Sequence, residues 1–370
     1  MLYLDNAATS VRKPFSVYKA MLTGTLFNSV NAGRGGHKMS VRGADIIVSA
    51  QDEAAELFNI KNPQNIAFMP NATYGLNLVI LGMLKGGGHA VVTCMEHNSV
   101  LRPVHLMSNY TVVWADDKGY VNPQKVKEAI REDTCLIVCT HASNVCGSIQ
   151  PVCEIGKIAN ENNIPFLVDA AQSAGCIECD VEKMKADFLV FSGHKGLMGP
   201  LGSGGVYVRD AKKLSPVITG GTGSSSESLE QPLFMPDMLH SGTMNVPAIK
   251  ALGEGIKFIR KTGVNTIYEK EKFLADKFED CLRNMGKIKV YGGENKTGTV
   301  AFNIVGKTSG ETAQAIGDKI ALRAGYHCAP LAHKALGTEK TGAVRASFGF
   351  FNKKSDVERA VDAVWKIRDV

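Results

Sequence analysis

The sequence predicts an α/β protein with a mostly parallel, seven-stranded sheet in a large domain and a smaller C-terminal α+β domain. The chain has 370 residues, which is more than the about 100–200 residues of a typical single domain. Hydrophobic residues make up 44% of it and charged residues 21%, so it can build large packed cores. Short apolar runs alternate with helix-like segments through the first two hundred residues. This alternation is typical of a sheet covered by helices on both faces.

Seven short runs rich in Val, Ile and Phe are the expected strands of the large domain. They lie at residues 65–69, 90–93, 111–114, 136–140, 166–169, 188–192 and 206–208. Helices are expected between many of them, for instance at 41–58, 74–84, 123–131 and 151–162. We expect the large domain to cover residues 15–245.

The smaller domain is expected to combine residues 1–14 with residues 246–370. After a Gly/Ser-rich loop at 220–228, its predicted elements follow in chain order. They are a helical region at 246–285, strands at 287–291 and 299–305, a helix at 310–322, a strand at 344–348 and a last helix at 355–367.

Charge and cysteine usage exclude several classes of protein. The formal net charge is only +6 and no long run of like charges occurs, which argues against nucleic acid or a membrane surface as partner. The longest apolar run, 78–84, is far too short to span a bilayer, and the first residues lack the pattern of a signal peptide. Nine scattered cysteines, an odd number, indicate reduced thiols and a cytoplasmic location.

Two strand ends carry the residues that point to a cofactor. Asp169 ends the run at 166–169, and Lys195 follows the run at 188–192 between two glycines. Alone, such an Asp is as often a helix cap, and such a Lys is more often a surface charge. Together they are what pyridoxal phosphate requires: a lysine for a Schiff base and a carboxylate beside the pyridine nitrogen.

Three further loops carry side chains suited to the same cofactor. Asn71-Ala-Thr-Tyr-Gly75 opens a helix, whose N-terminus with Ala72 and Thr73 forms an anion site or simply a capped end. His97 follows the run at 90–93, where an imidazole can stack on an aromatic ring or cap a helix. Asn144 follows the run at 136–140 and offers a side-chain amide.

With these residues in view, the chain resembles the class V (fold type I) pyridoxal-phosphate-dependent enzymes of the cysteine desulfurase and selenocysteine lyase group. The resemblance covers nearly the whole chain. It rests on Leu4-Asp-Asn-Ala-Ala8, Val168-Asp-Ala-Ala-Gln172, Ser192-Gly-His-Lys195, Ser241-Gly-Thr-Met-Asn245, Arg323-Ala-Gly-Tyr-His-Cys328, Arg345-Ala-Ser347 and Asn352. Gly196-Leu-Met-Gly199 and Met244 depart from the common pattern of the family without touching a chemical role.

The resemblance implies a role for each of these positions. Lys195 would bind the cofactor covalently and shuttle protons, Asp169 would pair with the pyridine nitrogen, and His97 would stack on the ring. Gln172 and Asn144 would face the phenolic oxygen. Thr73, Ser192 and His194 would hold the phosphate, helped by Thr243 of a second subunit in a homodimer. Arg345, with Asn144, would bind the substrate carboxylate, and no metal is implied.

The resemblance also implies that Cys328 is the nucleophile, taking sulfur from L-cysteine as a persulfide and passing it to an acceptor protein. Neighbouring His327, Arg323 and Lys334 would favour the thiolate if they face it, and Gly325 and Gly337 would let its loop move. Four other interpretations stay open. They are a selenocysteine lyase acting on L-selenocysteine, a class V aminotransferase or lyase with an idle Cys328, a binding protein without catalysis, and a zinc or thiol-redox protein built on Cys176 and Cys179.

Overall fold

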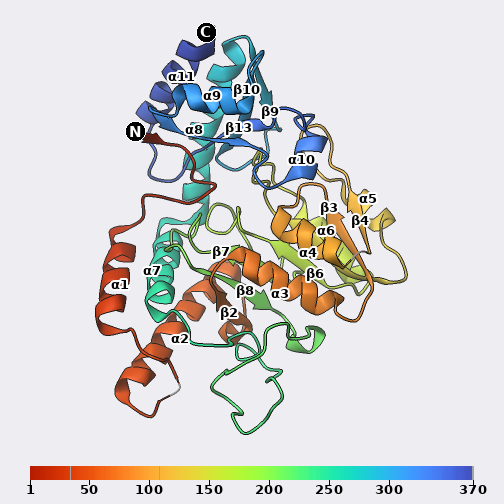
Figure 1. Cartoon of the computed structure of the whole chain (residues 1–370), viewed down its shortest axis with the longest axis vertical. Helices are drawn as coiled ribbons and strands as arrows, with labels where there is room; N and C mark the ends of the chain where they lie inside the picture. The colour runs from red at the N-terminus through yellow and green to blue at the C-terminus, as the bar shows by residue number, and fades with distance from the viewer. Residues whose placement is uncertain (34, 108, 369–370) are drawn as a thin grey trace.

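A computed structural model describes residues 1–33, 35–107 and 109–368, and its centre is a seven-stranded sheet (Figure 1). The strand order is β2-β8-β7-β6-β5-β3-β4, and all neighbours pair in parallel except at β8, which is antiparallel to both β2 and β7. The predicted seven-stranded, mostly parallel sheet is confirmed. The strands are β2 (Ile66–Met69), β3 (His89–Thr93), β4 (Tyr110–Val113), β5 (Thr134–Thr140), β6 (Phe166–Asp169), β7 (Phe188–Ser192) and β8 (Gly204–Val208).

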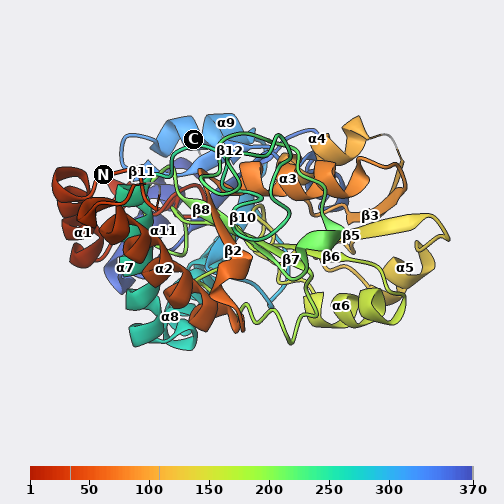
Figure 2. The ribbon, with the colours of Figure 1, turned by 90° about the horizontal axis from the view of Figure 1, so that it is seen from below.

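Helices cover both faces of this sheet because successive side chains of each strand point to opposite faces. In β5, Leu136 and Val138 pack on the side of α3 (Ala72–Leu84) and α4 (Asn98–Leu106). Ile137 and Cys139 of the same strand pack on the opposite side. The helices of that second face are α2 (Lys38–Phe58), α6 (Val152–Glu161) and α7 (Val246–Thr262). Figure 2 shows α3 and α4 on one side of the sheet and α6 on the other.

A second sheet lies in the smaller part of the molecule. It is antiparallel in the order β12-β13-β10-β9, and Phe278, Phe302 and Phe348 pack edge to face in the core beside it. Its strands and helices are β9 (Ile288–Tyr291), β10 (Thr299–Ile304), β12 (Arg323–Gly325), β13 (Ala343–Ser347), α8 (Val264–Asn284), α9 (Ser309–Ile316) and α11 (Lys354–Arg368).

Two predicted elements of this part differ from the structure. The predicted helix at 310–322 ends at Ile316, and residues Ile320–Ala321 form β11, which pairs in parallel with β1 (Leu2–Tyr3). The pairing buries Leu2 and Ile320 together, so a contact with the distant N-terminus overrides the local helical pattern. The predicted helical region at 246–285 is two helices, because Gly263 between α7 and α8 has φ of 87°.

The remaining α-helices of the described residues are α1 (Phe15–Phe27), α5 (Pro123–Glu128) and α10 (Pro330–Ala335). α1 packs against α7 through Val17, Ala20 and Ala251. α5 follows β4, and α10 follows the loop of Cys328. Among the described residues, no helix is long and apolar enough to cross a lipid bilayer. The domain boundaries at 14 and 245 stay a prediction.

Candidate active site

The candidate site lies at the carboxyl edge of the central sheet, where ligands of open α/β sheets bind. Asp169 is the last residue of β6, Ser192 is the last residue of β7, and the loops after β3 and β5 carry His97 and Asn144. A single cavity there is lined by every residue predicted to hold the cofactor except Thr243. These residues are Ala72, Thr73, His97, Asn144, Asp169, Gln172, Ser192, His194 and Lys195. Thr243 lies on an exposed loop.

Lys195 and Asp169 form the charged centre of the cavity. Burial lowers the pKa of Lys195 to about 8, with the charges of Arg345 and Arg323 acting in the same direction and Asp169 opposing them. Burial raises the pKa of Asp169, although the Ala171 N–H, which it accepts at 2.9 Å, and the charge of Lys195 act against that rise. The lysine can therefore release a proton near neutral pH and act as a nucleophile.

One end of the cavity is suited to an anion. Among the described residues, Ser192 Oγ and His194 Nδ1 are buried there without a hydrogen-bond partner. The first residues of α3, Ala72 and Thr73, line the same cavity, and Asn71 caps the helix by accepting from Tyr74 N–H at 2.9 Å. Unpaired donors around a helix N-terminus fit a phosphate group.

His97 is held in a single orientation. Its Nδ1 accepts the Ser99 backbone N–H at 3.0 Å, so the neutral ring carries its proton on Nε2. Burial lowers the pKa of His97 to about 4, and the positive charge of Lys195 adds to this. Ser99 Oγ lies 2.9 Å from His97 Nδ1 and 2.7 Å from Thr73 Oγ1. Ser99 thus joins the ring to the anion end, a role for which the sequence carried no signal beyond a serine in a helical first turn.

Glu96 fixes the two strand ends beside the cavity. One of its carboxyl oxygens accepts from Thr93 Oγ1 at 2.6 Å and from Thr140 N–H at 2.8 Å, so it ties the end of β3 to the end of β5. Burial raises the pKa of Glu96 to about 8, so the side chain is a neutral acid at physiological pH. The loops that carry His97 and Asn144 begin at these two strand ends, so Glu96 fixes where both loops start.

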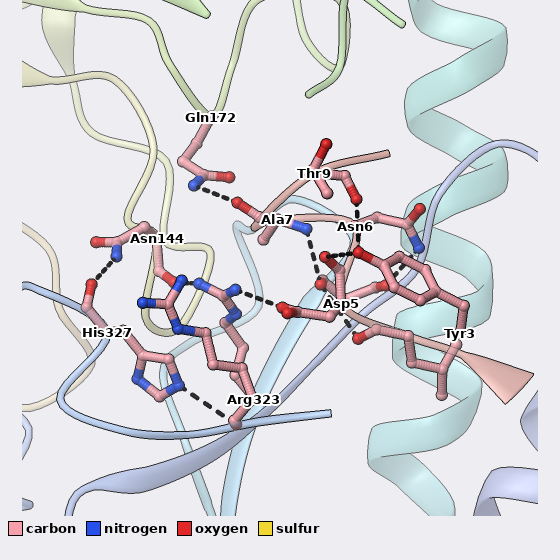
Figure 3. A network of polar contacts seen from close by, with 12 residues as sticks. Tyr3, Asp5, Asn6, Ala7, Thr9, Asn144, Gln172, Arg323 and His327 are labelled. Carbon is pink, nitrogen blue, oxygen red and sulfur yellow. Dashed lines mark hydrogen bonds and ion pairs between the residues drawn. The ribbon is translucent and has the colours of Figure 1, made fainter. Parts of the chain in front are cut away.

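Arg345 lies beside the cavity and is 1% exposed. Its guanidinium donates to Asp5 Oδ1 at 2.7 Å and to the Asn144 carbonyl at 2.6 Å, while its buried Nε has no partner among the described residues. The Asn144 side chain donates to the His327 carbonyl at 2.5 Å, and Gln172 donates to the Ala7 carbonyl at 3.0 Å (Figure 3). Asp5 is the polar partner that sequence reasoning missed, although its segment was one of the matched motifs.

Cys328 is exposed on the loop that follows β12. Arg323 faces it, with an N–H donor 3.8 Å from Sγ, and the Asn98 N–H donates to the Cys328 carbonyl at 2.7 Å. The other two cations expected there have different partners. The His327 ring lies against His333, and the Lys334 ammonium lies 5.2 Å from the centre of the Trp114 ring.

Cys179 is buried and Cys176 is partly buried, and neither lines the cavity of the proposed cofactor. Cys179 Sγ lies 3.4 Å from Ser173 Oγ and 3.6 Å from His141 Nδ1. Burial raises the pKa of Cys179 to about 12 and that of Cys176 well above its usual value, so both remain thiols. Within the part of the chain that the structure describes, no cluster of His, Cys, Asp and Glu could hold a metal ion. The zinc interpretation therefore has no geometric support.

Comparison with known proteins agrees with this geometry. The family model for class-V aminotransferases matches residues 2–360. A probable cysteine desulfurase of Pyrococcus abyssi is 35% identical over 97% of this chain and 92% of the relative. The cysteine desulfurase of Haloferax volcanii is 30% identical over 100% of this chain and 90% of its own length.

Solved structures show the same relationship. The apo cysteine desulfurase of Thermococcus onnurineus NA1 matches with a TM-score of 0.93 and 32% identity, covering 100% of this chain and 94% of the other. A cysteine desulfurase of Escherichia coli matches with a TM-score of 0.88 and 26% identity over 98% of this chain and 94% of the other. The chain belongs to the class-V aminotransferase family, and its relatives there are cysteine desulfurases.

Proposed function

We propose that the protein is a pyridoxal 5'-phosphate-dependent cysteine desulfurase, which converts L-cysteine to L-alanine and holds the released sulfur as a persulfide on Cys328. One observation carries this proposal. The loop of an exposed cysteine is hydrogen-bonded to Asn98 and Asn144, which flank a cavity that joins a lysine to a buried carboxylate. An aminotransferase needs the lysine and the carboxylate but not the cysteine.

The donors in the cavity fit the cofactor. Ser192, His194 and Thr73 would hold its phosphate, Asp169 would pair with the pyridine nitrogen, and Gln172 and Asn144 would face the phenolic oxygen. The His97 ring would stack on the cofactor. Lys195 would bind the cofactor covalently and carry a proton to and from the substrate α-carbon. When bound, pyridoxal phosphate supplies an electron sink for that carbon.

The substrate carboxylate would bind at Arg345 and Asn144. A guanidinium offers two parallel donors to a carboxylate, and Arg345 keeps a buried Nε–H that no described residue accepts. The incoming carboxylate would share this guanidinium with Asp5.

Cys328 then forms an S–S bond to the substrate sulfur while the C–S bond of the substrate breaks, and the electron pair of that bond stays with the carbon. The carbon takes up a proton and leaves as alanine. One thiol and one cysteine become one persulfide and one alanine, so the step needs no outside oxidant. An acceptor protein would then take the outer sulfur of the persulfide.

The surface supports a homodimer, which we include in the proposal. The α1 residues Phe15, Tyr18, Leu22 and Leu26 recur at helical spacing and are all exposed, with Phe15 80% exposed. Exposed Thr243 would reach the phosphate of the second subunit. The nine cysteines are free thiols, which fits the proposed cytoplasmic location.

The proposal is tested with purified protein, added pyridoxal phosphate, L-cysteine and a reductant. With the reductant we expect alanine and sulfide in equal amounts. In a single turnover without the reductant we expect persulfide on the peptide that contains Cys328. Lys195→Ala is the matched control and should give none of these products. Alanine without persulfide in the reaction that lacks the reductant would contradict the desulfurase mechanism.

A further inference from the structure

The turn that presents Cys328 has an unusual backbone. His327 and Cys328 have φ values of 50° and 57°, so two consecutive residues with side chains lie in the left-handed region. This region is unfavourable for residues that carry a Cβ, and it is seldom used by two in a row. Other contacts must therefore hold the turn.

A buried set of side chains contacts this turn from behind. His327 Nδ1 lies 3.2 Å from His333 Nε2, and the two rings stack with centroids 5.4 Å apart. His333 Nδ1 lies 2.7 Å from Thr338 Oγ1. At its other end, His327 Nε2 lies 3.4 Å from the Arg323 carbonyl oxygen. His327, His333 and Thr338, which we call the histidine chain, are 3%, 0% and 1% exposed.

The acceptor at one end gives the histidine chain a direction. Burial lowers the pKa of His327 to about 3 and that of His333 to about 4, so each ring is neutral with one N–H and one lone pair. A carbonyl oxygen only accepts, so His327 Nε2 donates to Arg323. His327 Nδ1 then accepts from His333 Nε2. His333 Nδ1 accepts from the Thr338 hydroxyl at 2.7 Å, whose other acceptor, the His333 carbonyl oxygen, is farther away at 3.2 Å. Each bond depends on the next, and the Thr338 hydroxyl supplies the first donor.

The histidine chain reaches the two residues beside the proposed nucleophile: Arg323, which faces the thiol, and His327, which precedes Cys328. It ends on the backbone of Arg323, whose guanidinium lies 3.8 Å from Cys328 Sγ, and it passes through His327, the residue before Cys328. We propose that His333 and Thr338 are positioning residues, which hold the left-handed turn so that the Cys328 thiol meets the substrate sulfur beside Arg323. This inference rests on the proposed function of Cys328.

Thr338→Val tests the inference because valine keeps the shape of threonine and removes the hydroxyl. The variant should bind pyridoxal phosphate and L-cysteine with nearly unchanged affinity, because neither Thr338 nor His333 lines the cofactor cavity, and the histidine chain reaches it only through the His327 carbonyl that accepts from Asn144. The rate constant for persulfide formation on Cys328 in a single turnover should fall about 5- to 10-fold, and so should kcat. This is the effect expected from the loss of one buried hydrogen bond. Thr338→Ser keeps the hydroxyl and should restore the wild-type rate.

A second variant and a readout without turnover complete the test. His333→Phe keeps a ring of similar shape without nitrogen atoms and should reproduce the loss seen with Thr338→Val. The Ala329 amide, which bonds to the Tyr326 carbonyl across the turn at 2.9 Å, should exchange hydrogen faster in both variants than in Thr338→Ser.

Wild-type kcat in Thr338→Val, or an equal loss in Thr338→Ser, would overturn the inference, and so would unchanged exchange at Ala329. If the wild type itself releases no alanine, the proposed function fails. The exchange comparison would still decide whether the histidine chain holds the turn.

Discussion

Burial, and after it the surrounding charges, tunes the chemistry of Lys195. Its amine must be neutral to attack the aldehyde of pyridoxal phosphate, and the pKa near 8 places that form within reach of neutral pH. For apoprotein mixed with pyridoxal phosphate, we expect the rate of covalent attachment at Lys195 to rise as pH increases through about 8 and then to level off.

Borohydride reduction followed by peptide mapping at each pH measures this rate. Lys195→Ala should still hold the cofactor noncovalently through Asp169, His97 and the phosphate site. Label on a peptide that lacks Lys195, or a rate that keeps rising well above pH 8, would contradict the assignment.

Cys328 separates the proposed desulfurase from its nearest alternatives. Cys328→Ser replaces the thiol by a hydroxyl that stays protonated at neutral pH, so no thiolate is available to attack sulfur. The variant should bind cofactor and L-cysteine normally and release no alanine from L-cysteine. With L-selenocysteine it should keep substantial turnover, because selenium leaves carbon more readily. Alanine release at the wild-type rate would mean that the cysteine is structural.

Sequence reasoning found the residues of the site that carry distinctive chemistry and missed those that only support them. Lys195, Asp169 and Cys328 stand in recognisable local settings. Asp5 and Ser99 do not, because their partners Arg345 and Thr73 lie far away in the chain. A local pattern cannot show which distant side chain will meet an ordinary aspartate or serine.

At the scale of single elements, helical glycines show where a helix packs closest against its neighbours. A Cβ at Gly156 in α6 would overlap the Met184 carbonyl oxygen, whereas a Cβ at Gly310 in α9 would meet only Thr308 Oγ1 at 3.9 Å. Gly156→Ala should lower the free energy of unfolding by about 1–3 kcal/mol, because overpacking outweighs the gain in helix propensity. Gly310→Ala is the matched control and should raise it by up to about 1 kcal/mol.

Urea denaturation of the two variants beside the wild type measures both changes. Equal midpoints for Gly156→Ala and Gly310→Ala would show that α6 can move away from the Met184 carbonyl without cost.

The elements that sequence reasoning predicted well are those whose own residues determine them. Five of the seven strands of the central sheet are buried along their whole length, as in Phe166–Asp169 and Phe188–Ser192, and the strands were located within one or two residues. β1 and β11 have two residues each and exist because they pair with one another. The helix predicted at 310–322 was too long for that same reason.

At the scale of the whole molecule, the proposed shared site makes the subunits interdependent. Thr243→Ala should weaken pyridoxal phosphate binding about 5- to 10-fold, since one hydrogen bond from the second subunit to the phosphate is lost. Sedimentation should show a two-fold dimer, the commonest closed assembly. A monomer with full activity at all dilutions would exclude the shared site.

Mixed dimers give the sharper measurement. In a dimer of one Lys195→Ala subunit and one Thr243→Ala subunit, one site keeps Lys195 and receives an intact Thr243 from its neighbour. Reassociation of the two variants should therefore recover wild-type cofactor affinity at that site. If the affinity does not recover, Thr243 either acts in the site of its own subunit or does not contact the cofactor.

The guanidinium of Arg345 has a consequence for how this protein could change its substrate. It joins three distant stretches of chain: the N-terminal segment at Asp5, the loop after β5 at Asn144 and its own strand β13. Removing one member of a fully buried ion pair typically costs about 3–5 kcal/mol, a large part of the stability of most proteins, and the pair here approaches that limit with Arg345 1% and Asp5 20% exposed. A protein that evolved to accept an uncharged substrate by replacing this arginine would also lose the contacts that hold these three segments together, and with them folding stability. The proposed recognition of the substrate carboxylate would therefore be conserved through the requirement for a stable fold.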